Sequence, residues 1–544
     1  EPARTRARRG IVIRSLVLMG MLLGHALLCL ACHEGWSQIE SDWPIAWHDH
    51  PMHYHNALVT RSFFAQNGTT AGYDPYFMAG YAKSIVSDPS GTLIDVVIAV
   101  LGRDRPAMTY KLLIVGVMAL LPWLIAGATW LIWERLDAVL VATTAFLVYL
   151  WTDFPLEYAG FGMIAFLLVI PLSLVVLALI MRFLHRGGFG RWLIASVGAS
   201  AVMLVHPLAL QTLVPAVLAS YVMAMLRSRR LGEQYPISRH LGLWVIPVLV
   251  VALNTFWWLP GMVLSETRDS DGANFFSHPE PVLSRIAQIF GLAVPDQPPI
   301  QVILLGGSVM GIAALRRRCP IQAIGLGVFR GMGFFGGYLA GWFPVFHFLQ
   351  PGRNTYAVYS AGAIAAGIGW SAVQRQLSRA PARLDRWLAL AALLVGIRVF
   401  VPTPELVWLV ERVREHFRPG DRIYYEEGGE SRSDLIDPFG GLRYGGLLPA
   451  LTRVEVIGGP FLHVPVRENF TQFGMGRLFG IDRWGREDFE RFGHLYGPEG
   501  IVCWSPQSRA FCQENPDLVE IVAERDALLI AKIRGFEGDA IRGE

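Results

Sequence analysis

Long apolar runs recur along the first three quarters of the chain, separated by short loops in which arginine is frequent. A helix needs about 20 mostly apolar residues to cross a bilayer, and loops rich in Lys and Arg stay on the cytoplasmic side. Hydrophobic residues make up 53% of the chain and charged residues only 17%. Most of this chain therefore cannot lie in water, and we expect a polytopic α-helical membrane protein.

The apolar runs predict about eleven membrane-spanning helices. They cover approximately residues 11–31, 108–133, 137–151, 161–184, 191–205, 208–226, 241–263, 298–315, 321–341, 356–374 and 385–401. Arginine-rich loops such as “HRGGFGR” and “QRQLSRAPARLDR” fall on the same side as the N-terminal “RTRARRG”, which the positive-inside rule makes cytoplasmic. Loop charge also favours two short spans, not one kinked span, around His206-Pro207. We expect a multi-pass protein of a bacterial inner membrane.

Two segments are expected outside the membrane on the same side. The first, 32–107, is an outer loop with interfacial helices within a membrane domain of residues 1–401. The second, 402–544, is a mixed α/β domain, because it is charged and contains β-like runs such as “DRIYYEE”, “RVEVIGG” and “GIVCWSP”. The run “LVEIVAERDALLIAKI” predicts a hairpin turning at Arg525-Asp526. Cys503 and Cys512 are close enough in sequence to pair in an oxidising compartment, and the sequence leaves that pairing open.

Polar and charged residues gather at the expected outer ends of the spans, where they are functional candidates because charge is costly at membrane depth. They are Asp49, Asp153, Glu157, His206, Glu266 and Arg353. The short turn “WTDFPLEY” is the most informative, since a connection between two apolar spans needs no acids. The alternative for this turn is that Asp153 caps the next helix.

The stretch “AWHDHPMHYHNA” places His48, His50, His53 and His55 around Asp49. A strand-like conformation would put all of these histidines except His53 on one face, and Pro51 is expected to break any helix. Imidazole suits Zn, Cu, Fe or Ni better than the Mg or Mn expected for phosphate chemistry. One interpretation is a metal held by Asp49, His48, His50 and His55. Hydrogen-bonded or solvated histidines are the interpretation we favour.

The stretch “CLACH” has the C-x-x-C-H pattern of c-type haem attachment, through Cys29, Cys32 and His33. Haem would also need a second axial ligand, which Met52 or the nearby histidines could supply. We favour small, soft residues in a membrane helix followed by an interfacial histidine, and expect no haem.

A long first outer loop with an acid just after the first span, a second acid in the next outer loop, many spans and an outer C-terminal domain together resemble the GT-C superfamily of integral membrane glycosyltransferases. Five stretches resemble, more narrowly, the YfhO-like group, also called 6-pyruvoyl-tetrahydropterin-synthase-related membrane proteins. They are “HDHPMHYHNA”, “GYDPYFMAGY”, “VEVIGGPF”, “LFGIDR” and “IVCWSP”. The likeness extends over nearly the whole chain, through short motifs. It implies transfer of a sugar from a polyprenyl-phosphate donor to an acceptor outside the membrane, usually with inversion.

Carried over by position, the resemblance makes Asp49 the principal acid, acting as a base or as a ligand of a divalent Mg or Mn ion. Asp153 and Glu157 become a second acidic site, and Arg353 would bind the carrier phosphate. The further substrate-binding candidates are His206, Glu266 and Asp74. The expected partners are the lipid-linked donor and membrane lipid; the net charge of +3 predicts no nucleic acid.

Two rival functions remain at this point. A transporter of lipid-linked sugars would need polar residues deep within several spans, and apart from Arg330 and Arg398 the spans are nearly free of charge. A non-catalytic subunit of a larger membrane complex would use the outer domain as a docking face. The sequence leaves the sugar, the carrier and the acceptor open.

Overall fold

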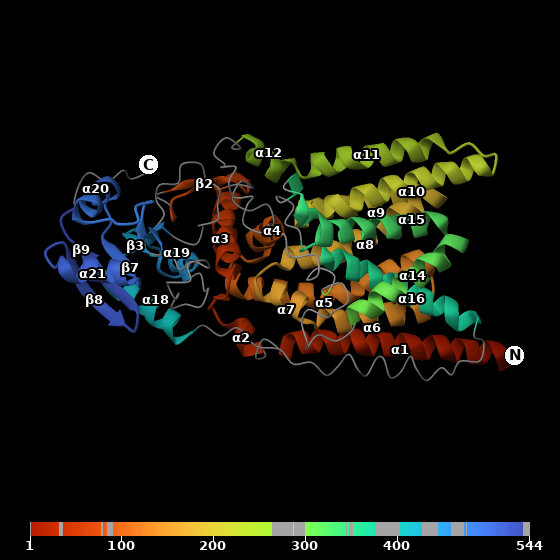
Figure 1. Cartoon of the computed structure of the whole chain (residues 1–544), viewed down its shortest axis with the longest axis horizontal. Coiled ribbons are helices and arrows are strands. Elements are labelled where there is room, and N and C mark those ends of the chain that lie inside the picture. The colour runs from red at the N-terminus through yellow and green to blue at the C-terminus, as the bar shows by residue number, and fades with distance from the viewer. Residues whose placement is uncertain are drawn as a thin grey trace.

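The computed structural model describes residues 2–31, 36–77, 80–83, 91–263, 287, 300–343, 345–346, 352–376, 403–426, 444–458, 473–474 and 476–536. Helices fill most of the first 376 residues, and the strands of the largest sheet come after residue 403. The long helices run side by side in a bundle, and the sheet lies beyond one end of it (Figure 1). The N-terminus lies at the opposite end (Figure 1).

Seven helices in the described part are long and apolar enough to cross a membrane, or up to nine if each of two bent helix pairs counts as one span. The seven are α1 (Pro2–Ala31), α5 (Pro106–Trp133), α8 (Ile164–Arg186), α10 (Leu210–Arg230), α14 (Ile300–Arg318), α15 (Pro320–Phe334) and α16 (Thr355–Gln376). The bent pairs are α6 (Leu136–Leu150) with α7 (Asp153–Gly160), and α11 (Ile237–Leu253) with α12 (Thr255–Val263). A shorter apolar helix, α9, covers Phe189–Val205. Every expected span coincides with one of these helices except 385–401, which lies outside the described residues.

Helix α16 is enclosed by α14, α6 and α15, and small residues allow this close packing. A Cβ atom at Gly311 of α14 would lie only 1.8 Å from the backbone oxygen of Ala365 in α16. A Cβ at Gly367 would lie 2.4 Å from the backbone oxygen of Ala138 in α6. Helices in a bilayer gain from such contacts because lipid provides no hydrophobic force between them.

The chain reverses at His206, as the loop charges predict. Helix α9 ends at Val205, a short 3-10 turn covers Pro207–Ala209, and α10 begins at Leu210. The Nδ1 atom of His206 accepts a hydrogen bond from the backbone N–H of Leu208, at 3.2 Å. Two helices therefore flank His206-Pro207, and its ring stabilises the turn between them.

The segment predicted as the first outer loop, called the first outer segment below, forms a layer between the bundle and the sheet (Figure 1). It contains α2 (Trp36–Glu40), α3 (His50–Asn67), β1 (Gly72–Asp74), β2 (Tyr81–Lys83) and α4 (Thr92–Leu101). The expectation that Pro51 breaks any helix is wrong, because Pro51 lies in the first turn of α3, where an N–H has no partner within the helix anyway.

The C-terminal part holds a five-stranded mixed sheet in the order β4-β3-β7-β9-β8. Its strands are β3 (Arg422–Tyr425), β4 (Glu455–Gly458), β7 (Gly500–Cys503), β8 (Val519–Arg525) and β9 (Leu528–Ile533). Each coincides with one of the predicted β-like runs, and β8 and β9 form the predicted hairpin. Strands β4, β3 and β7 are parallel neighbours, whereas β9 is antiparallel to both β7 and β8.

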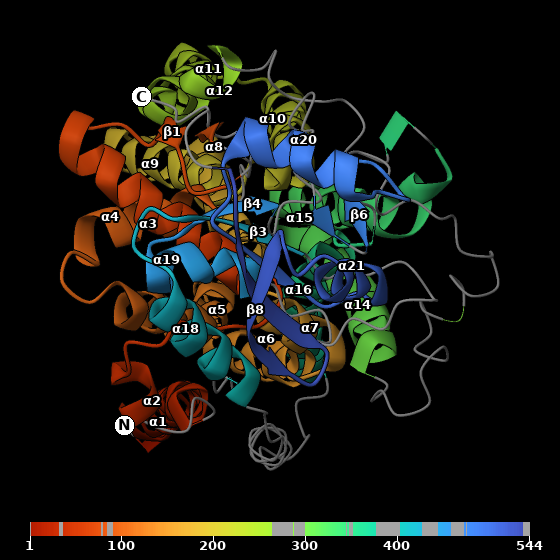
Figure 2. The ribbon, with the colours of Figure 1, turned by 90° about the vertical axis from the view of Figure 1, so that its left-hand side faces the viewer.

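Several helices pack around this sheet. They are α18 (Pro404–His416), α19 (Leu448–Thr452), α20 (Arg486–Tyr496) and α21 (Pro506–Glu514). Seen from the sheet side, these elements lie over the ends of the bundle helices (Figure 2). The Sγ atoms of Cys503 and Cys512 are buried and 3.9 Å apart, as two free thiols.

The sheet is joined to the first outer segment. The backbone N–H of Val456 in β4 donates to the backbone oxygen of Tyr76, at 2.8 Å, and Phe77 forms an isolated parallel bridge with Val456. Close to α19, a Cβ at Gly446 would lie 2.9 Å from Cβ of Pro51 in α3. The C-terminal part thus contacts the chain two residues from Asp49.

Candidate active site

Asp49 lies directly before α3, at the sheet end of the bundle. It occupies the N-cap position of α3, yet its side chain makes no capping hydrogen bond there. Its backbone N–H donates to the backbone oxygen of Phe161, at 3.2 Å, and its own backbone oxygen accepts from His53, at 3.0 Å. The side chain is half-buried. The main chain thus fixes the position of Asp49 and leaves capping out of the carboxylate's role.

His50 and Gly162 hold the start of α3 against the end of α7. His50 is fully buried; its Nδ1 lies 2.8 Å from the hydroxyl of Tyr110, and its Nε2 lies 3.2 Å from the backbone oxygen of Ala159. Gly162 has φ +86°, and a Cβ there would lie 3.1 Å from the backbone nitrogen of His50. Glycine at position 162 therefore allows an approach that a side chain would obstruct.

Asp153 and Glu157 both lie on α7, four residues apart, so they share one face of this helix. The N-cap residue of α7 is Thr152, so Asp153 stands in the first turn and not at the cap. Both acids are exposed. The sequence predicts only a tight turn here, but the structure has a short helix bent by 63° from α6. Because the C-terminal end of α7 is joined to Asp49 through Phe161, the structure brings the two predicted acidic segments together.

Arg353 and His206 border the same region. The guanidinium carbon of Arg353 lies 5.9 Å from the centre of the Tyr158 ring on α7. Phe166 of α8 is 6.0 Å from the ring of Tyr158 and 5.9 Å from that of His206. The segment with Arg353 is also tied to α10, because Gln211 donates a hydrogen bond to the Oδ1 atom of Asn354.

Asp74 has other neighbours than the residues around Asp49 and Arg353. Its carboxylate is fully buried, 2.9 Å from Nε2 of His55, and it accepts a hydrogen bond from the backbone N–H of Tyr76, also at 2.9 Å. The hydrogen bond between His55 and Asp74 joins α3 to β1. It therefore helps to hold α3, the helix that Asp49 precedes, in place. Glu266 lies outside the described residues.

The predicted metal ligands are not assembled. Within the described ranges, no group of three or more His, Cys, Asp or Glu side chains could hold a metal ion. The side chains of Asp49, His48, His50 and His55 diverge: His48 packs on Phe161 with ring centres 4.2 Å apart, His50 bonds to Tyr110, and His55 bonds to Asp74. The residues present do not fit the proposed four-residue site, and hydrogen bonding accounts for His50 and His55. Of the haem pattern, Cys29 is buried in α1, while Cys32 and His33 lie outside the described residues.

Sequence reasoning missed a polar cluster below Arg353, inside the bundle. The hydroxyls of Tyr338 and Tyr359 are 2.5 Å apart, and Tyr359 donates to Gln301 at 3.2 Å. Arg330 of α15 interacts electrostatically with Tyr359, and within the described part of the chain its buried Nε has no hydrogen-bond partner. The one sequence signal was the charge of Arg330 within an apolar run.

No protein-family model and no curated protein matches this sequence. The fold is similar to solved structures of ArnT from Cupriavidus metallidurans, with a TM-score of 0.54 for the apo state and 0.53 for the complex with undecaprenyl phosphate. Both are 12% identical, and each match covers 97% of this chain and 98% of that chain.

A second similar structure is the archaeal oligosaccharyltransferase AglB from Archaeoglobus fulgidus, in complex with an inhibitory peptide and a dolichol-phosphate. Its TM-score is 0.52 at 12% identity, with 89% of this chain and 69% of that chain covered. The match to another structure of the archaeal enzyme covers 82% of this chain and 62% of that chain, so this chain spans less than two thirds of that protein's length. ArnT and AglB are GT-C membrane glycosyltransferases, so the predicted GT-C-like fold is confirmed. The YfhO-like grouping stays a prediction.

Proposed function

We propose that this protein is a membrane glycosyltransferase that moves a sugar from a polyprenyl-phosphate donor to an acceptor hydroxyl outside the membrane. The observation that carries the proposal is the junction of α3 and α7, where Asp49 is bound through the main chain to the segment that bears Asp153 and Glu157. The similarity to ArnT and AglB supports it, because structures of both hold a polyprenyl-type phosphate lipid.

In the proposed reaction the acceptor oxygen attacks the anomeric carbon of the donor sugar. The acceptor proton passes to the Asp49 carboxylate as the new bond forms. The bond between the anomeric carbon and the phosphate oxygen breaks, and the lipid phosphate leaves with the electron pair, so the anomeric centre inverts. Arg353 binds the departing phosphate, for which a planar guanidinium suits two parallel hydrogen bonds.

The remaining candidates have supporting roles. Asp153 and Glu157 form an exposed acidic face of α7, whose C-terminal end is joined to Asp49 through Phe161, and we assign to them the orientation of polar groups of the sugar or acceptor. Asp74 and His55 hold α3 in position. Arg330 precedes Gly333 by about one turn of α15. Gly333 packs against the segment of Arg353, because a Cβ added at Gly333 would lie 3.2 Å from the backbone oxygen of Asn354. It is therefore a second cation close to the segment of Arg353. No step is assigned to a metal ion.

The test is the substitution Asp49→Asn, which keeps the shape of the side chain and removes its basicity. Purified protein is supplied with a cell-envelope extract that contains both polyprenyl-phosphate sugars and hydroxyl acceptors. The free polyprenyl phosphate released is measured by mass spectrometry, because this product is common to all such donors. We expect turnover to fall about a thousandfold. Wild-type turnover in this variant would remove Asp49 from the reaction.

The matched control is Asp104→Asn, the same change at an exposed acid of the first outer segment. We expect this variant to retain wild-type turnover. Binding of undecaprenyl phosphate by the Asp49→Asn variant should also be unchanged, since Asp49 is assigned to the acceptor and not to the carrier. A donor lipid moved intact across vesicles, with no carrier released, would favour the transporter.

A further inference from the structure

A cavity lined with arginines lies at the end of the bundle opposite the sheet. Its volume is about 250 Å³, and it lies between the ends of α5, α8, α14, α15 and α16. Helix α16 begins beside the site of Arg353 and ends at this cavity, which places the two sites on opposite sides of the membrane domain. The arginines that line it are Arg135, Arg182, Arg186, Arg318 and Arg375.

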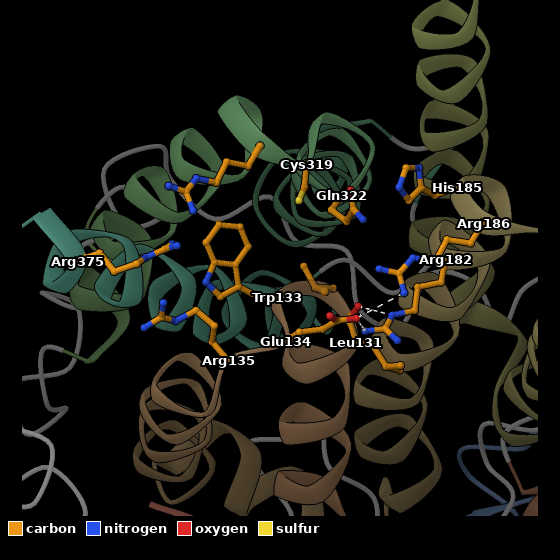
Figure 3. Close-up of a pocket in the computed structure, with 12 residues that line it drawn as sticks. Leu131, Trp133, Glu134, Arg135, Arg182, His185, Arg186, Cys319, Gln322 and Arg375 are labelled. Atoms are coloured by element: carbon orange, nitrogen blue, oxygen red, sulfur yellow. Dashed lines mark hydrogen bonds and ion pairs between the residues drawn. The ribbon is translucent and has the colours of Figure 1, made fainter. Parts of the chain in front are cut away.

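Ion pairs account for only part of this positive charge. Arg135 forms two hydrogen bonds to the buried carboxylate of Asp137, at 2.8 and 2.9 Å. Glu134 accepts from Arg182 at 2.6 Å and lies 3.8 Å from Arg186. Figure 3 shows Arg182 and Arg186 beside Glu134, and Arg135 and Arg375 on the other side of Trp133.

Two of the arginines are left without an acid. Within the described part of the chain, neither Arg318 nor Arg375 forms an ion pair. Arg375 is nonetheless held in place: its guanidinium lies 5.1 Å from the centre of the Trp133 ring, and its Nε donates to the backbone oxygen of Ser371, at 3.2 Å. The carboxylate of Asp137 also attracts Arg375, but it is already hydrogen-bonded to Arg135 and Ser371. A cation fixed on an aromatic ring and not ion-paired with an acid of its own can receive an anion.

Hydrogen bonds also fix Trp133, which lines the cavity beneath Arg375. Trp133 is buried and its indole N–H donates to the hydroxyl of Ser371, at 3.3 Å. That hydroxyl donates in turn to Asp137, at 3.0 Å. This chain of bonds connects the ring below Arg375 to the carboxylate that holds Arg135. Ordinary arginines at a membrane surface, which are solvated, need no such support.

A second groove of about 410 Å³ adjoins the arginine cavity, and the two share Trp133, Arg318 and Arg375. Arg317 also lines this groove, and most of its other lining residues are apolar. The groove runs between α14 and α16, and its apolar lining includes Met310, Ala313, Ala314, Ala372 and Val373. Met310 is 52% exposed, and its neighbour Val309 is 64% exposed. Such exposure of large apolar side chains on a membrane helix indicates that the groove opens toward lipid.

We propose that these two cavities form one binding site for a phospholipid whose headgroup carries a net negative charge. Its headgroup phosphate lies between Arg318 and Arg375, and one acyl chain lies in the groove between α14 and α16. Basic pockets between helices that adjoin apolar surface match this chemistry in both of their parts. The site is distinct from the proposed transferase site, from which the length of α16 separates it.

The proposal is tested by native mass spectrometry of the full-length protein in detergent, titrated with phosphatidylglycerol or with phosphatidylcholine. We expect phosphatidylglycerol to bind more tightly. The double substitution Arg318→Gln/Arg375→Gln should weaken its binding about twenty-five-fold, since each arginine contributes about a factor of five. The control Arg229→Gln/Arg316→Gln removes the same charge from exposed arginines outside the cavity lining, and should leave binding unchanged.

Two further measurements test the acyl-chain groove and distinguish a lipid from a soluble phosphate. Ala314→Phe fills the apolar groove without changing charge, and should weaken lipid binding while the protein stays folded. Glycerol 1-phosphate and inorganic phosphate should not displace the lipid at millimolar concentration. The proposal is overturned if both cavity variants bind like wild type, if the control variant loses as much, or if a soluble phosphate binds as tightly as the lipid.

Discussion

Two carboxylates in this molecule occupy opposite kinds of surroundings. Glu426, at the end of β3, is fully buried and accepts hydrogen bonds from the backbone N–H groups of Gly476, Trp504 and Ser505 and from the hydroxyl of Ser508, at 2.7 to 3.1 Å. Asp49 is half-buried at the junction of α3 and α7, and its side chain does not cap the helix that follows it. An acid enclosed by donors serves the fold, whereas Asp49 is positioned by its main chain and is the acid to which we assign chemistry.

The largest expected loss of stability comes from replacing Glu426, because it accepts several buried hydrogen bonds. Glu426→Gln places an NH₂ group among N–H donors, so at least one of them loses its partner. We expect a loss of about 3 kcal/mol in the free energy of unfolding of the sheet region. The buried thiols of Cys503 and Cys512 report it, because they react with iodoacetamide only when this region opens. Their alkylation, followed by peptide mass spectrometry, should be about a hundredfold faster.

The control for this experiment is Glu490→Gln, which removes a partly exposed acid that is 2.8 Å from Arg486 on α20. Exposed ion pairs contribute little, so alkylation should change less than about fivefold. Burial and the neighbouring Cys512 raise the pKa of Cys503, so the reactive thiolate is scarce in the folded state at neutral pH. Unchanged labelling in Glu426→Gln would mean that its hydrogen bonds are not what holds this region closed.

The second effect concerns the junction that presents Asp49. Gly162→Ala puts a side chain at φ +86° and 3.1 Å from the nitrogen of His50, and we expect it to cost about 2 kcal/mol locally. Hydrogen exchange in the peptides around residue 162 should become faster, and turnover should fall although every acid remains. The matched control is Gly68→Ala at the other end of α3. It has a similar φ of +66° but nothing within 4 Å of the added Cβ, so turnover should be kept.

The sequence is a good guide to the helices and a poor guide to this junction, for a physical reason. A membrane helix needs only a local run of apolar residues, and the predicted ranges match the helices from 11 to 376. The short strands were recognisable by their β-branched and aromatic residues, although their order was not, because pairing β9 beside β7 depends on distant contacts.

The junction depends on such distant contacts throughout. His50 finds its partners on α5 and α7, so its role as an anchor is not visible in “AWHDHPMHYHNA”. The same holds for His55, whose partner Asp74 comes from the next strand. Alternating histidines indicate a metal site only if this stretch is strand-like. Helix α3 begins at His50, and a helix turns successive side chains in different directions. Tyr158, which lies beside Arg353, carried no signal of its own.

The third prediction concerns Arg353, the residue proposed to bind the phosphate of the donor. Arg353→Gln removes the guanidinium beside Tyr158 and should weaken binding of undecaprenyl phosphate about tenfold, which corresponds to about 1.4 kcal/mol. Because Arg353 is assigned to binding, KM for the donor should rise more than kcat falls. Arg353→Lys should recover part of the affinity. The control is Arg103→Gln, an exposed arginine of the first outer segment. Equal losses in both variants would assign the effect to general surface charge.

The smallest effects are expected at the exposed acids of α7. Asp153→Asn and Glu157→Gln change side chains at the surface of a short helix, so the stability of each variant should stay within about 0.5 kcal/mol of wild type. Each should lower turnover about threefold, because the remaining acid still orients the substrate from the same face of α7. The double variant should lose more than the product of the two single losses, since the two groups are proposed to share one task. Losses that simply multiply would separate the two acids, and no loss at all would leave Asp49 as the sole acid of the site. A loss of turnover in these variants would mean that an exposed acid on α7 can take part in the reaction. Unchanged turnover would mean that a part in the reaction also requires the main-chain bond that holds Asp49 to Phe161.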